Sequence, residues 1–176
     1  MAPPAPVDVR DWIRDIPDFP KPGVLFKDIT PLLSNPDAFR TAIDQLEEQF
    51  RDRGVDVIAA AEARGFIFGA PLAVRMNAGF VPIRKPGKLP YATIAQEYLL
   101  EYGHDRLEIH SDALAAGRRV LLIDDVLATG GTMRACCDLV QSTGAELIAC
   151  AFVLELSFLG GRAKLEPSEV FSLVTY

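Results

Sequence analysis

The stretch Val120-Leu-Leu-Ile-Asp-Asp-Val-Leu-Ala-Thr-Gly-Gly-Thr132 joins two chemical signals that conflict with each other. A run of branched apolar residues ends in two adjacent carboxylates, Asp124 and Asp125. A small-residue turn of the type that cradles phosphate groups follows them. Because two negative charges repel an anion bound beside them, the stretch raises the question of which ligand suits both halves.

The second half of the stretch suits a phosphate monoester. The apolar run predicts a buried strand over 120–123, with the two acids at its carboxyl end, and the turn after them predicts the start of a helix. Glycines let backbone N–H groups approach an anion, a helix N-terminus adds positive partial charge, and threonine hydroxyls donate hydrogen bonds. The residues expected to hold the phosphate are Ala128, Thr129, Gly130, Gly131 and Thr132.

The two carboxylates suit either a sugar diol or a divalent cation. A diol donates two hydrogen bonds to such a pair, whereas a cation cancels its charge. A ligand with a phosphate and a vicinal diol a few ångströms apart resolves the conflict, and ribose 5-phosphate has that layout. Taken alone, two acids after a strand are more often solvated loop residues, and a Thr-Gly-Gly-Thr sequence is more often a plain turn. Their conjunction in one stretch is the specific signal.

The rest of the chain predicts strands that alternate with helices. Apolar residues at helical spacing predict a helix over 36–53, capped by Ser34 or Asn35. The charged loop Glu62–Gly65 follows one apolar run and precedes a second helical segment. The predicted strands are residues 55–61, 79–83, 120–123 and 147–154.

This alternation predicts an α/β fold with a mostly parallel twisted sheet that is flanked by helices on both faces. Ligands of such sheets bind at the carboxyl ends of the strands, where the charged loops lie. The length of 176 residues predicts one domain, residues 1–176. Residues 1–8 are rich in proline and lack a basic start, so we expect a short frayed tail rather than a signal peptide.

The composition limits the classes of partner. The net charge of −6 disfavours a general nucleic-acid binder, although a local basic pocket for a small anion is compatible with it. No apolar run is long enough to cross a bilayer, so we expect no membrane partner and a cytoplasmic location. Three cysteines, two of them adjacent at 136 and 137, fit neither a disulfide framework nor a zinc site, and we expect reduced, buried thiols.

The stretch 120–132 resembles the phosphoribosyl pyrophosphate signature of the type I phosphoribosyltransferases. Further segments resemble the adenine phosphoribosyltransferase family within that group, in the order in which the family shows them. Those segments are Phe19–Pro31, Glu62–Phe66, Ile83–Pro90, Leu100–Gly103 and Leu107–His110. The resemblance extends from about residue 12 to the end of the chain. Ala63 stands where many members carry serine.

The resemblance implies transfer of the 5-phosphoribosyl group from phosphoribosyl pyrophosphate to N9 of adenine, which gives AMP and pyrophosphate. It also implies Mg²⁺, bound mainly through oxygens of the donor rather than by protein ligands, and a homodimer. The fold implied is that of the type I phosphoribosyltransferases, with a small N-terminal hood over the base to which residues 12–34 contribute.

The resemblance also assigns roles to basic residues. Departure of pyrophosphate leaves positive character on the ribose, so the enzyme must hold the leaving anion. The residues implied for this task are Ala63, Arg64, Arg84, Lys85 and Lys88. Without the resemblance, the cluster 84–88 is most simply a solvated basic loop, and in the family such residues can reach across a dimer interface. The family further implies a cis peptide bond between Ala63 and Arg64.

Adenine must lose a proton from N9 or move protons around its ring as the new bond forms, so a nearby carboxylate is expected. Glu101 matches the acid/base residue of the family, and Tyr102 is expected to seat a lid formed by the flexible loop 86–104. The residues implied for the adenine pocket are Leu25, Phe26, Lys27 and Leu156. We expect structural rather than catalytic roles for both histidines.

Three alternatives remain at this point. A regulatory protein that only senses the donor would need a nucleic-acid-binding surface, and neither an added helical domain nor a basic face is visible. A phosphoribosyltransferase for guanine, xanthine or orotate would share the donor site, but the segments Phe19–Pro31 and Leu100–Gly103 disfavour it. A phosphoacceptor receiver domain carries its acids early in the chain, whereas this pair stands at 124 and 125.

Overall fold

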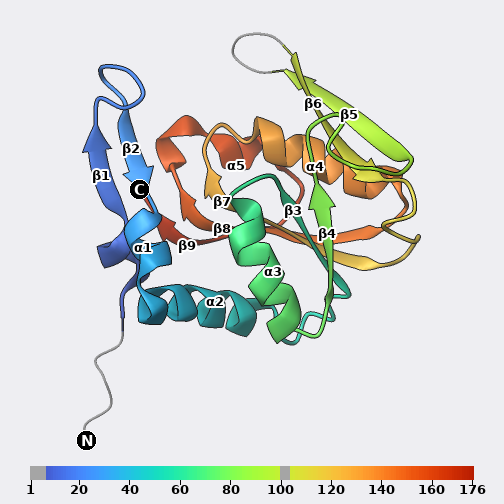
Figure 1. Cartoon of the computed structure of the whole chain (residues 1–176), viewed down its shortest axis with the longest axis horizontal. Coiled ribbons are helices and arrows are strands. Elements are labelled where there is room, and N and C mark those ends of the chain that lie inside the picture. Colours follow the sequence, from blue (N-terminus) through green and yellow to red (C-terminus); the bar gives the residue numbers. More distant parts are fainter. Residues whose placement is uncertain (1–6, 100–103) are drawn as a thin grey trace, which may run out of the picture. The chain divides into compact units, whose positions relative to one another are not determined.

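The computed structural model describes residues 7–99 and 104–176. The chain forms two compact units, one within Met1–Gln45 and one within Leu46–Tyr176 (Figure 1). The boundary falls inside the helix α2 (Pro36–Phe50). The organisation of the whole chain as one domain stays a prediction.

The N-terminal unit contains an antiparallel hairpin in which β1 pairs with β2, with Ile16 opposite Phe26. The elements of this unit that precede α2 are η1 (Val9–Trp12), β1 (Arg14–Pro17), β2 (Leu25–Asp28) and α1 (Thr30–Ser34). The carboxylate of Asp8 caps η1 by accepting from the backbone N of Arg10 at 2.9 Å. Of the tail expected over 1–8, residues 1–6 lie outside the described residues, and Asp8 is the N-cap of η1.

Asp28 ties this hairpin to α1. Its carboxylate accepts from Nη2 of Arg14 at 2.6 Å and from the backbone N of Thr30 at 2.9 Å. These hydrogen bonds, chiefly the one from Arg14, lower the pKa of Asp28. At the start of α2, Oδ1 of Asn35 accepts from the backbone N of Ala38 at 2.9 Å, which confirms the predicted cap.

The C-terminal unit is built on a parallel sheet of five strands in the order β4-β3-β7-β8-β9, as the alternating pattern predicts. Its strands are β3 (Val57–Ala61), β4 (Gly79–Ile83), β7 (Arg119–Leu127), β8 (Glu146–Glu155) and β9 (Val170–Thr175). Its complete helices are α3 (Gly65–Arg75), α4 (Gly131–Ser142), η2 (Ser157–Leu159) and α5 (Gly161–Lys164).

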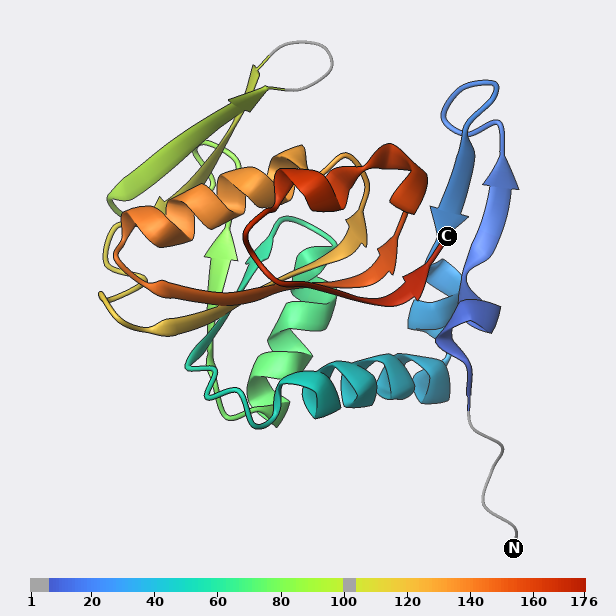
Figure 2. The same cartoon turned by 180° about the vertical axis from the view of Figure 1, so that it is seen from behind.

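Helices cover both faces of this sheet. Figures 1 and 2 show α3 on one face and α4 with α5 on the other. Ala59 and Leu122 belong to the buried cluster under α4, whereas the alternate residue Ala60 lies under α3. A methyl group on Gly69 of α3 would lie 2.8 Å from the ring of Phe80, so the close approach of α3 needs glycine there.

Strand β7 continues past the point at which the sequence predicted its end. Asp124 and Asp125 lie inside the strand rather than just after it, because Val126 and Leu127 still pair with β8. The partner of Leu127 is Glu155. Only Val126 separates the acids from that last pair, so the strand reaches close to the turn that follows.

The segment 86–104 was predicted to be one flexible loop, and this is wrong for much of its length. Thr93–Leu99 forms the strand β5, which pairs in antiparallel fashion with β6 (His104–His110). Ile94 packs against the buried cluster of the C-terminal unit, which also contains Leu107. In the partner strand, apolar and polar residues alternate from Arg106 to His110, and this strand signal was missed from the sequence.

All three cysteines are free thiols and buried, as predicted. Cys136 and Cys137 lie in α4, and Sγ of Cys137 lies 3.5 Å from Sγ of Cys150 in β8. These thiols therefore fill the space between the helix and the sheet as small apolar groups.

Candidate functional site

A cavity of about 340 Å³ opens at the carboxyl edge of the parallel sheet. Two segments line it, the loop after β3 and the end of β7 with the turn that follows. The lining residues are Glu62, Ala63, Arg64, Asp124, Asp125, Val126, Leu127, Ala128, Thr129, Gly130, Gly131, Thr132 and Met133. The structure therefore brings together the predicted acids, the predicted turn, and two of the five residues predicted for pyrophosphate.

The turn leads directly into α4. Gly130 has a left-handed backbone (φ 81°), which glycine adopts without strain, and α4 begins at Gly131. Gly130 O accepts from the backbone N of Arg134 at 2.9 Å, which closes the first turn of the helix. The first N–H groups of a helix have no acceptor within the helix, so those of 131–133 are oriented to meet an anion in the cavity.

Asp124 and Asp125 differ in their surroundings. Oδ1 of Asp124 accepts from the backbone N of Asp125 at 2.9 Å, and Asp125 is 5% exposed. Burial of the Asp124 carboxyl, followed by the charge of Asp125, raises the pKa of Asp124 well above its ordinary value.

Arg64 joins the two segments of the cavity. Its Nε lies 2.5 Å from Oδ2 of Asp125, and its side chain is 53% exposed. Gly65 allows this approach, because a methyl group there would lie 3.0 Å from the backbone oxygen of Ile123 and 3.1 Å from Oδ1 of Asp124. The start of α3 is therefore held against the end of β7.

The predicted cis bond between Ala63 and Arg64 is wrong by one residue. The cis bond joins Glu62 to Ala63. Arg64 already has right-handed helical backbone angles (φ −72°, ψ −28°) as the residue that precedes α3. Arg64 therefore belongs to the start of the helix.

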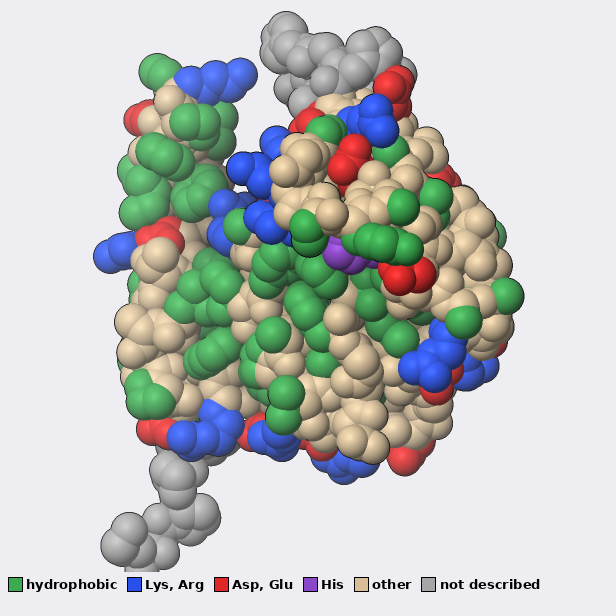
Figure 3. Space-filling model, turned by 45° about the vertical axis from the view of Figure 1, so that its right-hand side comes forward, with side chains coloured by type: hydrophobic (Ala, Val, Ile, Leu, Met, Phe, Trp, Pro, Cys, Tyr) green, Lys and Arg blue, Asp and Glu red, His purple; other side chains and the backbone are tan. Residues whose placement is uncertain are grey.

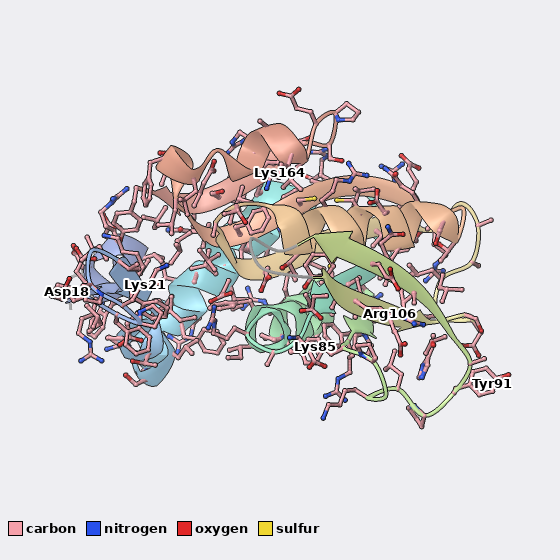
Figure 4. The ribbon with its side chains drawn as sticks, turned by 90° about the horizontal axis from the view of Figure 1, so that it is seen from above. Asp18, Lys21, Lys85, Tyr91, Arg106 and Lys164 are labelled. Carbon is pink, nitrogen blue, oxygen red and sulfur yellow. The ribbon has the colours of Figure 1, made fainter. Side chains whose placement is uncertain are left out.

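The basic cluster lies beside the cavity rather than in its lining. Nε of Arg84 donates to Oε2 of Glu62 at 2.8 Å, and its Nη1 donates to the backbone oxygen of Lys88 at 3.2 Å. Nζ of Lys85 lies 3.2 Å from Oδ2 of Asp105 in β6. Figure 4 shows Lys85 and Arg106 near the β5–β6 hairpin, away from Lys164 of α5.

Sequence reasoning missed Glu62 as a member of the site. Glu62 lines the cavity, and its carboxylate binds Arg84. The backbone N of Glu62 also donates to Ile83 O at 2.9 Å, which holds the loop after β3 to the end of β4. The signal was present, because an acid that directly follows one parallel strand and an arginine that directly follows the adjacent one reach the same edge.

The residues predicted for adenine lie in two places. Leu25, Phe26 and Lys27 belong to β2 of the N-terminal unit. The ring centroids of Phe26 and Phe19 lie 5.1 Å apart, and the two rings pack edge to face. Leu156 belongs to the C-terminal unit, where its backbone N donates to Leu127 O at 2.9 Å. Leu127 itself lines the cavity.

Glu101 and Tyr102 lie outside the described residues. For the residues that are described, no group of three or more His, Cys, Asp or Glu side chains is placed to hold a metal ion.

Comparison with known proteins gives a consistent result. Residues 28–172 match the phosphoribosyl transferase domain family. The chain is 56% identical to the adenine phosphoribosyltransferase of Acaryochloris marina over 97% of this chain and 100% of that one. The structure of adenine phosphoribosyltransferase from Thermoanaerobacter pseudethanolicus has a TM-score of 0.92 and 53% identity, covering 96% of this chain and 98% of that one.

A third relative was solved with ligands. The adenine phosphoribosyltransferase of Saccharomyces cerevisiae, complexed with adenine and an imino-altritol 1,6-bisphosphate, matches with a TM-score of 0.89 and 43% identity. The match covers 94% of this chain and 96% of that one.

Proposed function

This chain belongs to the adenine phosphoribosyltransferase family, and on that premise we propose that it transfers the 5-phosphoribosyl group of phosphoribosyl pyrophosphate to N9 of adenine. The products are AMP and pyrophosphate, and the reaction salvages a free purine. The observation that carries the proposal is the cavity in which a carboxylate pair adjoins a glycine turn at a helix N-terminus. A pentosyl phosphate presents a diol and a phosphate to these two groups.

The turn holds the 5-phosphate in this proposal. The backbone N–H groups of Gly131 and Thr132 and the hydroxyls of Thr129 and Thr132 donate to the phosphate oxygens. The positive end of the α4 dipole adds to the attraction. Two observations support this role. Gly130, with its left-handed backbone, directly precedes α4. All five turn residues, from Ala128 to Thr132, line the cavity.

Asp124 and Asp125 accept hydrogen bonds from the 2- and 3-hydroxyls of the ribose. Their position three and two residues before the end of β7 supports this role, because it fixes both carboxyls on a strand instead of a mobile loop. As positive character develops on the ribose, a nearby carboxylate stabilises it. These acids thus favour the transition state as well as the bound donor.

The leaving pyrophosphate is held by Ala63, through its backbone N–H, and by Arg64. Arg84, Lys85 and Lys88 add positive charge around the leaving group. The exposed side chain of Arg64 at the cavity wall supports the first assignment. The acid partners of Arg84 and Lys85 orient these cations, because a charged hydrogen bond holds a long side chain in one geometry.

Mg²⁺ fits this site. The hard oxygen ligands that Mg²⁺ prefers would come mainly from the diphosphate and ribose of the donor, and the carboxylates of Asp124 and Asp125 lie in the same cavity. When bound, the ion neutralises the charge that develops on the leaving pyrophosphate. Arg64 performs part of the same task from the protein side.

Adenine is recognised by Leu25, Phe26, Lys27 and Leu156. The ring of Phe26 stacks on the base, and backbone groups of Leu25 and Lys27 read its edge, where the exocyclic amine donates and N1 accepts. A 6-oxopurine reverses this pattern and is rejected. The edge-to-face packing of Phe19 on Phe26 and the 2.6 Å ion pair of Lys27 with Asp15 support a rigid β2 backbone.

Glu101 exchanges the proton of adenine in the reaction, and Tyr102 seats the segment that carries it. A carboxylate within hydrogen-bond reach of the base is required for this step. Exclusion of water protects the ribose cation from hydrolysis, which would waste the donor. The hairpin of β5 and β6 supports this role, since both of its strands run to the segment 100–103.

We further propose a homodimer that works in the cytoplasm. The outer face of α3 supports the dimer, because Ile67 and Val74, which are seven positions apart on one helix face, are 37% and 83% exposed. Figure 3 shows hydrophobic side chains gathered on the face where α3 lies. Within the described ranges, no helix combines the length and the apolar character that a bilayer span requires.

Pyrophosphorolysis of AMP tests the function in the reverse direction. Purified protein with Mg²⁺ is mixed with AMP, with pyrophosphate or with both, and free adenine is measured by chromatography. We expect adenine only when both are present, because the ribose must pass to pyrophosphate. Adenine released from AMP alone would identify a hydrolase, and no adenine in any mixture would favour a protein that only binds the donor.

A further inference from the structure

Gly161, which opens α5, lies directly against the turn of the cavity. A methyl group on Gly161 would lie 2.2 Å from the backbone oxygen of Ala128 and 3.0 Å from the backbone N of Gly130. In the opposite direction, a methyl group on Gly130 would lie 2.5 Å from the backbone oxygen of Gly161. Non-bonded atoms do not approach so closely, so the two backbones leave no space for a side chain on either glycine.

An ion pair fixes α5 in this position. The guanidinium of Arg162 binds the Glu155 carboxylate through two hydrogen bonds of 3.0 and 2.5 Å, and its Nη1 donates to Val170 O at 2.7 Å. Ser172 Oγ donates to the same carboxylate at 2.8 Å. Glu155 is 4% exposed. Because a buried charge without partners is unfavourable, the contacts with Arg162 and Ser172 stabilise the charged carboxylate.

The residues before α5 are fixed as well. The backbone N of Leu156 donates to Leu127 O at 2.9 Å, directly before the turn begins. Ser157 donates through its backbone N to Tyr176 O at 3.0 Å. The segment 156–162 is thus attached to β7, to β8 and to the C-terminal residue, and it forms a firm support behind Ala128–Gly130.

We propose that Gly161 is a positioning residue for the 5-phosphate and that the pair of Arg162 with Glu155 holds it in place. This inference rests on the proposed function, because it takes the turn to be the phosphate site. Gly161 lies behind the turn and does not line the cavity, so it acts through Ala128 and Gly130. The backbone conformation at Ala128 and Gly130 determines whether several N–H groups of the turn point at one phosphate. If the turn shifts, these N–H groups no longer point at the same phosphate.

Two neighbouring glycines provide a matched pair of variants. Gly160 has a left-handed backbone (φ 66°) but open space around the position of a methyl group. Gly161 has no left-handed backbone, but its methyl position is occupied. Gly160→Ala therefore introduces backbone strain alone, whereas Gly161→Ala introduces a steric clash with the backbone of Ala128 and Gly130.

Steady-state kinetics with each substrate varied separately gives the test. In Gly161→Ala we expect the KM for phosphoribosyl pyrophosphate to rise by about 10- to 100-fold, while the KM for adenine changes little. In Gly160→Ala both constants should stay near those of the unchanged protein. An unchanged donor KM in Gly161→Ala, or the same rise in Gly160→Ala, overturns the proposal.

A second variant and a second readout cover the remaining outcomes. If Gly161→Ala does not fold, Arg162→Lys keeps the charge but loses the two-pronged contact with Glu155, and a smaller rise in the donor KM is expected. Calorimetric titration with ribose 5-phosphate measures phosphate binding without a base. If the unchanged protein binds this probe but transfers nothing to adenine, the proposed function fails, and equal affinity of Gly161→Ala for the probe still contradicts the positioning role.

Discussion

Nε of Arg64 lies 2.5 Å from Oδ2 of Asp125, so a cation from the loop after β3 and an acid from β7 meet across the edge of the sheet. The side chain of Arg64 is 53% exposed, whereas that of Asp125 is 6% exposed. A donor with a pyrophosphate and a diol offers a new partner to each of them. Arg64 and Asp125 can therefore replace their ion pair by contacts with the pyrophosphate and the diol of the bound donor.

Arg64→Ala should lower kcat/KM for phosphoribosyl pyrophosphate by about 10²- to 10³-fold, because the leaving anion loses a charged donor. Arg118→Ala is a matched control, since that side chain is 49% exposed and its Nε lies 4.0 Å from Asp56. Initial rates with saturating adenine measure the effect. If the two variants behave alike, Arg64 has no part in binding pyrophosphate.

Asp124→Asn combined with Asp125→Asn should weaken binding of the magnesium complex of the donor by about 10- to 100-fold, as expected for hydrogen bonds to charged groups. Isothermal titration calorimetry measures the dissociation constant directly. An unchanged donor affinity in the folded double variant would show that the ribose hydroxyls do not use this pair.

Asp124→Asn alone should change the dependence of stability on pH. The folded state raises the pKa of Asp124, so its contribution to stability is present at low pH and is lost as the pH rises through the raised pKa. Asparagine does not titrate. The free energy of unfolding of the variant, relative to that of the unchanged protein, should therefore increase from about pH 4 upward. Urea titrations across this range measure it, and a constant difference at all pH values contradicts the prediction.

Glu101→Ala should lower kcat by about 10²- to 10⁴-fold and leave the fold intact, as expected for loss of a general acid/base. Glu97→Ala provides the control, because Glu97 is an exposed acid of β5. Circular dichroism checks the fold of both variants. Near-normal turnover of Glu101→Ala would make Glu101 an ordinary surface residue.

Phe26→Ala should raise the KM for adenine more than the KM for the donor, because the base loses a stacking surface. Tyr91→Ala serves as a control for the loss of an aromatic ring, since Tyr91 is 63% exposed on the C-terminal unit. Kinetics with each substrate varied in turn separate the two constants. A larger effect on the donor would place the adenine pocket elsewhere.

The sequence predicted the elements that have a strong local signal. The apolar runs at 55–61 and 79–83 each contain a strand of the parallel sheet, and the run at 147–154 lies within β8. The turn before α4 followed from its glycines. The extension of β7 past Asp125 was not predictable in this way, because acids are unfavourable in strands in general, and the pairing with β8 and the ion pair with Arg64 come from distant segments.

Contacts between distant segments were the least predictable part of the site. The ion pair of Glu62 with Arg84 forms because β3 and β4 are neighbours in the sheet. Without the structure, only the resemblance to the family indicated a role for Arg84. The support of Ala128 by Gly161 has no local signal at all. Two glycines after a short helical turn are common in loops, and only the fold reveals that backbone atoms occupy the side-chain position of the second one.

We propose that the carboxylate pair and the turn serve transfer of a phosphoribosyl group to adenine. The most direct test offers adenine, hypoxanthine, guanine and orotate separately to the protein with Mg²⁺ and phosphoribosyl pyrophosphate, and follows the release of pyrophosphate. We predict rapid release with adenine alone and AMP as the product. Faster release with another base would contradict the adenine pocket, and donor binding without release on any base would contradict the enzymatic claim itself.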